Sequence, residues 1–227
     1  LRRAADAAEI WRSGDGTLVT DHVVLSTDGR RAAALVGGAT GAELRVWDIA
    51  KKRTRWSVSL ESDLIHGFPI MAPDGKLALH GILDNDLTGP LTVYDPDGRV
   101  LGRIPGVSWG YGFSCAFSAD SRWIAACEPG FGVVVMNLAE GGAITRYAFR
   151  NPELGVPEGL QPALEGRGFI VGGVTDYRSA LGRFDSGLLA DSEMRHAVDS
   201  HGSFRVLAGG HLLCLTREGL LLRDGRS

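Results

Sequence analysis

The sequence predicts an all-β protein built from five similar units of about 45 residues each. Three observations lead to this prediction. Tight-turn signals recur at an even spacing, short apolar segments flank each signal, and apart from a marginal candidate at residues 2–10 no helix-length amphipathic segment interrupts the pattern. Short apolar segments between regularly spaced turns are typical of repeated β-strands. The 227 residues are 44% hydrophobic and 22% charged, a composition that is ordinary for a soluble globular protein.

The turn signals are anchored at residues 28, 74, 120, 165 and 209, which are 46, 46, 45 and 44 residues apart. The first three read TDGR, PDGK and ADSR, and the last two are weaker. Asp favours tight turns because its side chain bonds the nearby backbone, and Gly favours them because it accepts a positive φ. Five such signals at this spacing therefore predict an internal repeat.

Each repeat contains four apolar segments that fit short strands. Two of them flank the turn, as HVVLS and RAAALVG do around residue 28 and FSCAFS and WIAAC around residue 120. The third segments are ELRVWD, LTVYD, GVVVMN, ALGRFD and LLLRD. The fourth segments are TRWSVSL, RVLGRIP, AITRYAF and, less clearly, LLADSEM at residues 188–194. Four short strands in about 45 residues match the size of one blade of a β-propeller.

At this point the chain resembles the WD40 repeat family. FSADSRWIAA is similar to the first hairpin of a WD40 blade, and AELRVWDIAKKR to its third strand, with Trp47-Asp48 matching the Trp-Asp dipeptide of that family. The corresponding dipeptides of the other repeats are degenerate: Tyr94-Asp95, Met136-Asn137 and Phe184-Asp185. The Gly-His dipeptide is not clearly present, since His66-Gly67 is reversed. The resemblance implies a single WD40-like β-propeller domain over residues 1–227.

Two arrangements of the blades are open. The segment AAEIWRS at residues 7–13 fits a strand, and the chain ends with the third strand of the fifth repeat. The N-terminal strand could therefore complete the last blade and close a ring of five, which would bury otherwise exposed sheet edges. The alternative is part of a larger ring, because seven blades are more usual among WD40 relatives and the sequence does not begin with Met.

The cysteines and histidines indicate no metal site and no cofactor. Cys115, Cys127 and Cys214 include no CxxC pair, and the six histidines show no HxH or HExxH spacing. A hairpin that turns at Asp120–Ser121 places Cys115 opposite Ala126, so Cys115 and Cys127 lie on opposite faces and should not bond. We expect buried thiols in a reducing, cytoplasmic compartment.

Charge and hydropathy argue against nucleic acid and membranes as partners. The net charge is −3, and the densest basic cluster, formed by Lys51, Lys52, Arg53 and Arg55, fits a solvated turn. No apolar segment approaches the roughly 20 residues that span a bilayer. Arg is far more frequent than Lys, which favours a bacterial source.

Recognition residues are expected in the loops before each first strand and between each second and third strand, which share one face of a propeller. Exposed aromatic residues there would bury a large area against a partner. An alternative is that they pack between blades. The candidates are Trp109, Tyr111, Phe131, Tyr177, Arg178 and His66.

A catalytic role is not expected. Some five-bladed propellers are glycosidases, which need two or three carboxylates on the inner strands. Of the expected inner strands, only the first has an acidic residue nearby, Asp21 just before it. The sequence therefore favours a non-catalytic platform that binds a protein or peptide, and the resemblance implies a scaffold or sensor module of a larger bacterial signalling or effector protein. The alternative is a propeller that binds or processes a small ligand or glycan at its central channel.

Overall fold

The fold is seen in a computed structural model that describes most of the chain. The described ranges are 18–38, 41–60, 64–83, 88–108, 115–128, 132–148, 156–162, 168–175, 178–185, 194–198, 200–206, 211–216 and 219–224. Burial of individual side chains is described only within residues 22–146. The expected strand at residues 7–13, the helix candidate at residues 2–10 and the turn anchors at residues 165 and 209 lie outside the described residues.

Five antiparallel sheets are present in the described part of the chain, and neighbouring strands in each sheet are consecutive in sequence. The first sheet contains β1 (Leu18–Leu25), β2 (Arg31–Gly38), β3 (Gly41–Asp48) and β4 (Arg53–Ser59). The second contains β5 (Leu64–Met71), β6 (Leu77–Leu83), β7 (Thr88–Tyr94) and β8 (Val100–Ser108). The third contains β9 (Cys115–Phe117), β10 (Trp123–Glu128), β11 (Gly132–Asn137) and β12 (Ala143–Ala148), with the 3-10 turn η2 (Leu138–Glu140) between β11 and β12.

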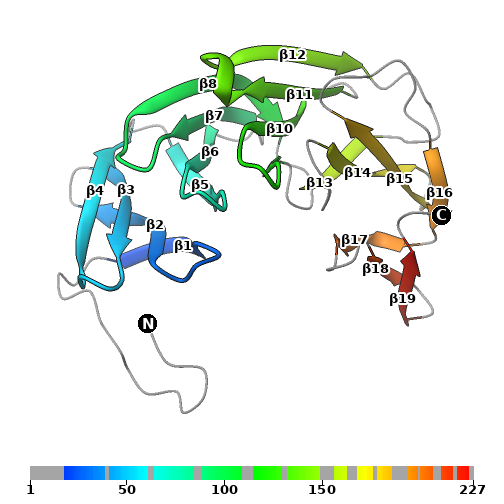
Figure 1. Ribbon diagram of the computed structural model, residues 1–227, viewed down its shortest axis with the longest axis horizontal. Coiled ribbons are helices and arrows are strands. Elements are labelled where there is room, and N and C mark those ends of the chain that lie inside the picture. The colour runs from blue at the N-terminus through cyan, green and yellow to red at the C-terminus, as the bar shows by residue number, and fades with distance from the viewer. Residues whose placement is uncertain are drawn as a thin grey trace.

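The fourth sheet contains β13 (Val156–Pro162), β14 (Gly168–Thr175), β15 (Arg178–Asp185) and β16 (Met194–Val198). The fifth has three strands, β17 (Ser200–Val206), β18 (His211–Thr216) and β19 (Gly219–Asp224). Figure 1 shows the five sheets following one another along an arc, with the first strand of each sheet on the inner side. This all-β arrangement is that of a propeller, as predicted, and four of its five described sheets have the expected four strands. Closure of five blades into a ring stays a prediction.

The turn between the first two strands is built in the same way in the first and third sheets. Ser118 N–H donates to the Trp123 carbonyl, Trp123 N–H donates to Ser118 Oγ at 3.0 Å, and Ser118 Oγ donates to Asp120 Oδ1 at 2.6 Å. Ser26, Asp28 and Arg31 repeat these contacts in the first sheet. Local side-chain bonds therefore fix both hairpins, as the turn signals in the sequence predicted.

Apolar cores fill the space between the first and second sheets and between the second and third sheets. We call the face of a sheet toward the next sheet its front and the face toward the preceding sheet its rear. The core between the second and third sheets joins the front of the second, through Val93 and Ile104, to the rear of the third, through Phe117 and Ile124. A second core joins the first and second sheets in the same way, with Val24 on one side and Met71 on the other. Each fully buried large side chain contributes about 1.5–3 kcal/mol, so these cores fix adjacent sheets to one another.

The rear face of the first sheet differs from the others at its inner strand. Leu25 pairs with Ala32, as Met71 pairs with Leu77 and Phe117 with Ile124, so the three residues occupy equivalent positions. Phe117 is 6% exposed, whereas Leu25 is 49% and its neighbour Val23 59% exposed. The inner strand of the first sheet therefore keeps apolar side chains in solvent at a position that a preceding sheet covers elsewhere.

The strand register bears on two details of the sequence prediction. Cys115 pairs with Ala126, which confirms that Cys115 and Cys127 lie on opposite faces, and both thiols are buried. The fourth strand of the fourth repeat was expected at residues 188–194. Residues 188–193 lie outside the described residues, and from Met194 to Val198 the strand β16 pairs with β15.

Candidate functional site

The expected recognition residues fall largely outside the described part of the chain. Four of the six are not among the described residues: Trp109, Tyr111, Phe131 and Tyr177. The backbones of the other two are placed: His66 lies in β5 opposite Ile82, and Arg178 begins β15 opposite Thr175. Both positions are near strand ends next to the connections that were expected to carry recognition residues. The six residues remain predictions as binding residues.

The inner strands contain more acidic residues than the sequence predicted. Asp21 lies within β1 and not before it, and β13 begins early enough to include Glu158. Glu158 is passed over by the pairing register between Pro157 and Gly159, as expected for a β-bulge. The expectation of a single acidic residue was wrong because bulges extend these strands beyond their apolar segments. Two carboxylate residues therefore lie on inner strands, one in the first sheet and one in the fourth.

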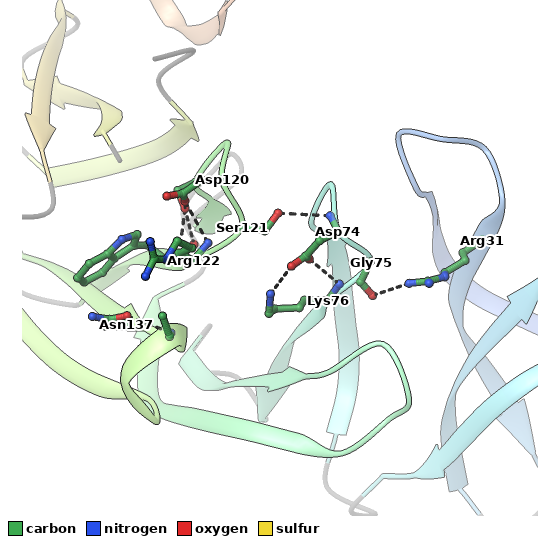
Figure 2. A network of polar contacts seen from close by, with 11 residues as sticks. Arg31, Asp74, Gly75, Lys76, Asp120, Ser121, Arg122 and Asn137 are labelled. Carbon is green, nitrogen blue, oxygen red and sulfur yellow. Dashed lines mark hydrogen bonds and ion pairs between the residues drawn. The ribbon is translucent and has the colours of Figure 1, made fainter. Parts of the chain in front are cut away.

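The tight turns lie at the end of the strands opposite to the connections that were expected to carry recognition residues. Side chains link these turns from sheet to sheet (Figure 2). Arg31 Nη1 of the first sheet donates to the Gly75 carbonyl of the second at 3.3 Å. Asp74 N–H of the second sheet donates to Ser121 Oγ of the third at 3.3 Å. Asp74 also pairs with Lys76. Polar contacts thus run through three consecutive turns.

A second set of contacts joins the outer strand of the first sheet to the second sheet. Arg55 Nη2 pairs with Asp97 Oδ1 at 2.7 Å, and its Nε donates to the Pro96 carbonyl at 2.9 Å. The indole Nε1 of Trp56 donates to the same carbonyl at 3.1 Å, and its ring lies 5.6 Å from the ring of Tyr94. Asp95 holds the turn that contains Pro96, because its Oδ1 accepts from the backbone N–H groups of Asp97 and Arg99.

His80 and Cys115 are titratable groups that are buried inside the protein. His80 is 1% exposed, and its Nε2 lies 3.2 Å from the Val107 carbonyl, to which it donates when Nε2 carries the proton. Burial lowers the pKa of His80, and the bond to Val107 partly opposes that shift. Burial raises the pKa of the Cys115 thiol to about 12. Both groups are therefore uncharged near neutral pH.

Metal and membrane features were searched within the same described ranges. No three side chains of His, Cys, Asp or Glu gather there into a group that could hold a metal ion. Those ranges also contain no helix with the length and apolar composition needed to cross a membrane.

Comparison with solved structures identifies the class of fold. The structure of U3-55K is similar to this chain with a TM-score of 0.58 and 13% sequence identity, over 95% of this chain and 63% of that chain. The crystal structure of the RRP9 WD40 repeats is similar with a TM-score of 0.62 and 14% identity, over 95% of this chain and 62% of that chain. This chain therefore has a WD40-like β-propeller fold and spans less than two thirds of either structure.

Comparison of sequences adds no family assignment, because no family model and no curated protein matches the chain. At 13% and 14% identity the structural similarity defines the fold alone. Function has to be inferred from the sites themselves, since one fold supports many functions.

Proposed function

We propose that this chain is a non-catalytic platform that binds a protein or peptide. The observation that carries the proposal is the linkage of consecutive sheets at their turn ends. Arg31, Ser121 and Trp56 each bond the backbone of a neighbouring sheet, and apolar cores fill the space between the sheets. Such linkage gives a rigid support for the connections at the other end of the strands, and recognition residues are commonly carried by loops on a rigid scaffold.

The partner contacts in this proposal come from the aromatic candidates. Trp109 and Tyr111 act as the main anchors, because large rigid side chains bury much area at a low entropic cost. Phe131, Tyr177, Arg178 and His66 extend the same surface. The module belongs to a larger bacterial signalling or effector protein in the cytoplasm, as scaffold or sensor, and the net charge of −3 disfavours a nucleic-acid partner.

The test is a comparison of two double variants. A partner is captured from an extract of the source cells with the immobilised chain, purified, and titrated by calorimetry. Trp109→Ala with Tyr111→Ala should weaken its binding at least about tenfold while the melting temperature stays unchanged. The control, Val100→Ala with Ile144→Ala, removes exposed apolar side chains from β8 and β12 and should leave affinity unchanged. Equal affinity of both variants and wild type would remove the proposed anchors.

A second candidate function is favoured by one observation, the presence of Glu158 and Asp21 on inner strands. Glycan-processing sites need at least two carboxylates, and β-bulges often re-aim side chains at such sites. In this function the chain binds or processes a glycan or other small ligand at the central channel. Turnover of a panel of aryl glycosides, measured with wild type and with Asp21→Asn and Glu158→Gln, decides between the two functions. Turnover that is lost in both variants would replace the platform proposal.

A further inference from the structure

Four basic side chains gather at the turn end of the first sheet. The Ile49 N–H donates to the Arg30 carbonyl at 2.9 Å, which holds the β3–β4 turn against the β1–β2 turn. Arg30 is thereby brought beside Lys51, Lys52 and Arg53, and all four residues are exposed. We call these four residues the basic turn patch.

The basic turn patch is poorly neutralised. In the part of the chain that the structure describes, no hydrogen bond or ion pair involves the side-chain nitrogens of Arg30, Lys52 or Arg53, and Lys51 Nζ lies 3.9 Å from Asp48 Oδ2. Arg55, which the sequence placed in the same basic cluster, instead pairs with Asp97 of the second sheet. The structure thus replaces Arg55 with Arg30 as the fourth member.

The two acidic residues of these turns neutralise the patch only in part, because each is also bonded within its own turn. Asp28 accepts from Ser26 Oγ at 2.6 Å and from Arg30 N–H at 3.0 Å; these bonds, the Ser26 bond first, and the nearby charges of Arg30 and Arg31 lower the pKa of Asp28. Asp48 accepts from Lys51 N–H at 2.9 Å. Two carboxylates against four cations leave a positive surplus on the first sheet. The turn end of the second sheet has no such surplus, since Asp74, Asp95 and Asp97 lie there with Lys76 and Arg99.

Lys52 stands in a backbone conformation that disfavours side chains. Its φ is 51°, in the left-handed region, whereas the corresponding turns of the second and third sheets place Gly98 (φ 90°) and Gly141 (φ 69°) there. An L-residue is strained in this region and glycine is not. A lysine at a position that the second and third sheets give to glycine indicates that its charge has a use, because such strain concentrates at functional sites.

We propose that the basic turn patch binds an acidic peptide segment of a protein partner. Four cations on two adjoining turns match a short segment with a few carboxylates, and unpaired charges of one sign attract and orient a partner of the opposite sign. Nucleic acid fits less well, because its binding uses a longer basic stripe and many phosphate contacts. The patch lies at the opposite end of the strands from Ser108 and Cys115, which border the connection that contains Trp109 and Tyr111, so the inference goes beyond the proposed function.

The experiment measures fluorescence anisotropy of a labelled glutamate-rich peptide with the whole chain. The test variant is Arg30→Gln/Lys51→Gln/Arg53→Gln. The matched control is Arg99→Gln/Arg103→Gln/Arg122→Gln, which removes three other exposed cations whose side chains have no partner within the described ranges. Wild type should bind the peptide with an affinity that falls with added salt. The test variant should bind about tenfold more weakly, and the control within about twofold of wild type.

Lys52→Gly separates binding from structure. It removes the left-handed strain together with the charge, so the melting temperature should stay equal or rise while peptide affinity falls about threefold. Three results would overturn the proposal: no binding of the peptide to wild type, an equal loss in the control variant, or tighter binding of single-stranded DNA than of the peptide. The last result would make the patch a nucleic-acid surface. None of these results depends on Trp109 or Tyr111.

Discussion

The indole of Trp56 in the first sheet lies directly over Gly98 in the second, so that a Cβ on Gly98 would be 2.8 Å from Trp56 Cδ2. Gly98 has φ 90°, and Trp56 Nε1 also bonds the Pro96 carbonyl two residues earlier. Two requirements therefore meet at Gly98: a left-handed backbone and the absence of a side chain. The contact shows that the boundary between these sheets depends on a residue with no side chain.

Gly98→Ala should lower the free energy of unfolding by about 2–4 kcal/mol, because left-handed strain adds to a clash with the indole. Gly29→Ala is the matched control. It has φ 67° but nothing within 4 Å of its added Cβ, so it should cost only the strain, about 1 kcal/mol. Chemical denaturation of both variants provides the measurement. Equal losses would show that Trp56 moves aside freely.

Ser118→Ala should destabilise the third sheet by about 1–2 kcal/mol. The hydroxyl accepts from Trp123 N–H and donates to Asp120, and Ser118 is fully buried, so the variant leaves a buried donor unpaired. Asp120→Asn keeps the acceptor oxygen and should cost less. Thermal melting of the two variants tests this, and a larger loss in Asp120→Asn would contradict the assigned role of Ser118.

Acidification should destabilise the protein through His80. Its pKa in the folded chain lies below the usual 6.5, mainly because of burial, so the unfolded chain binds a proton at higher pH than the folded chain. The free energy of unfolding is then unaffected by His80 above about pH 6.5 and falls below it, by at most about 1.4 kcal/mol per pH unit. Melting curves between pH 8 and pH 5 should slope less in His80→Gln. Identical slopes would exclude His80 as the cause.

The thiols of Cys115 and Cys127 should be unreactive in the folded protein. Both are buried, and burial raises the pKa of Cys115 to about 12, which leaves almost no thiolate at pH 8. In a Cys214→Ser variant, a maleimide reagent should label neither thiol in buffer and both in guanidinium. Non-reducing gels should show no internal disulfide. Fast labelling of the folded chain would indicate that the core between the second and third sheets opens readily.

Local chemistry explains why the sequence predicted some middle strands closely. The apolar segments LALHGIL at residues 77–83 and GVVVMN at residues 132–137 coincide with β6 and β11. The inner segments HVVLS, FPIMA, LQPAL and FRVLA predict strands that begin at residues 22, 68, 160 and 204. The strands begin four residues earlier, at Leu18, Leu64, Val156 and Ser200. Each contains a shift of register, which breaks the apolar alternation while pairing continues.

Contacts between sheets and between turns could not be predicted from the sequence. Arg55 and Lys51 are close in sequence, yet Arg55 reaches Asp97 in the second sheet, 42 residues away. Arg30 joins Lys51 only because two turns of one sheet are hydrogen-bonded to each other. Neither contact leaves a repeating pattern in the sequence, because both depend on how blades and turns pack. For the recognition surface, the sequence supplied candidate residues, and the structure places the backbones of His66 and Arg178 alone.

The alternation of front and rear faces has a consequence for cooperativity. Two of the described cores each unite two consecutive sheets, so the free energy that couples these sheets passes along the chain from neighbour to neighbour, as in a one-dimensional array. A substitution in one core weakens two blades directly and the others only through them. The first sheet, with Leu25 and Val23 uncovered, has fewer such stabilising neighbours on its rear side. Its inner strand should therefore exchange amide protons sooner than β10, which is covered on both faces.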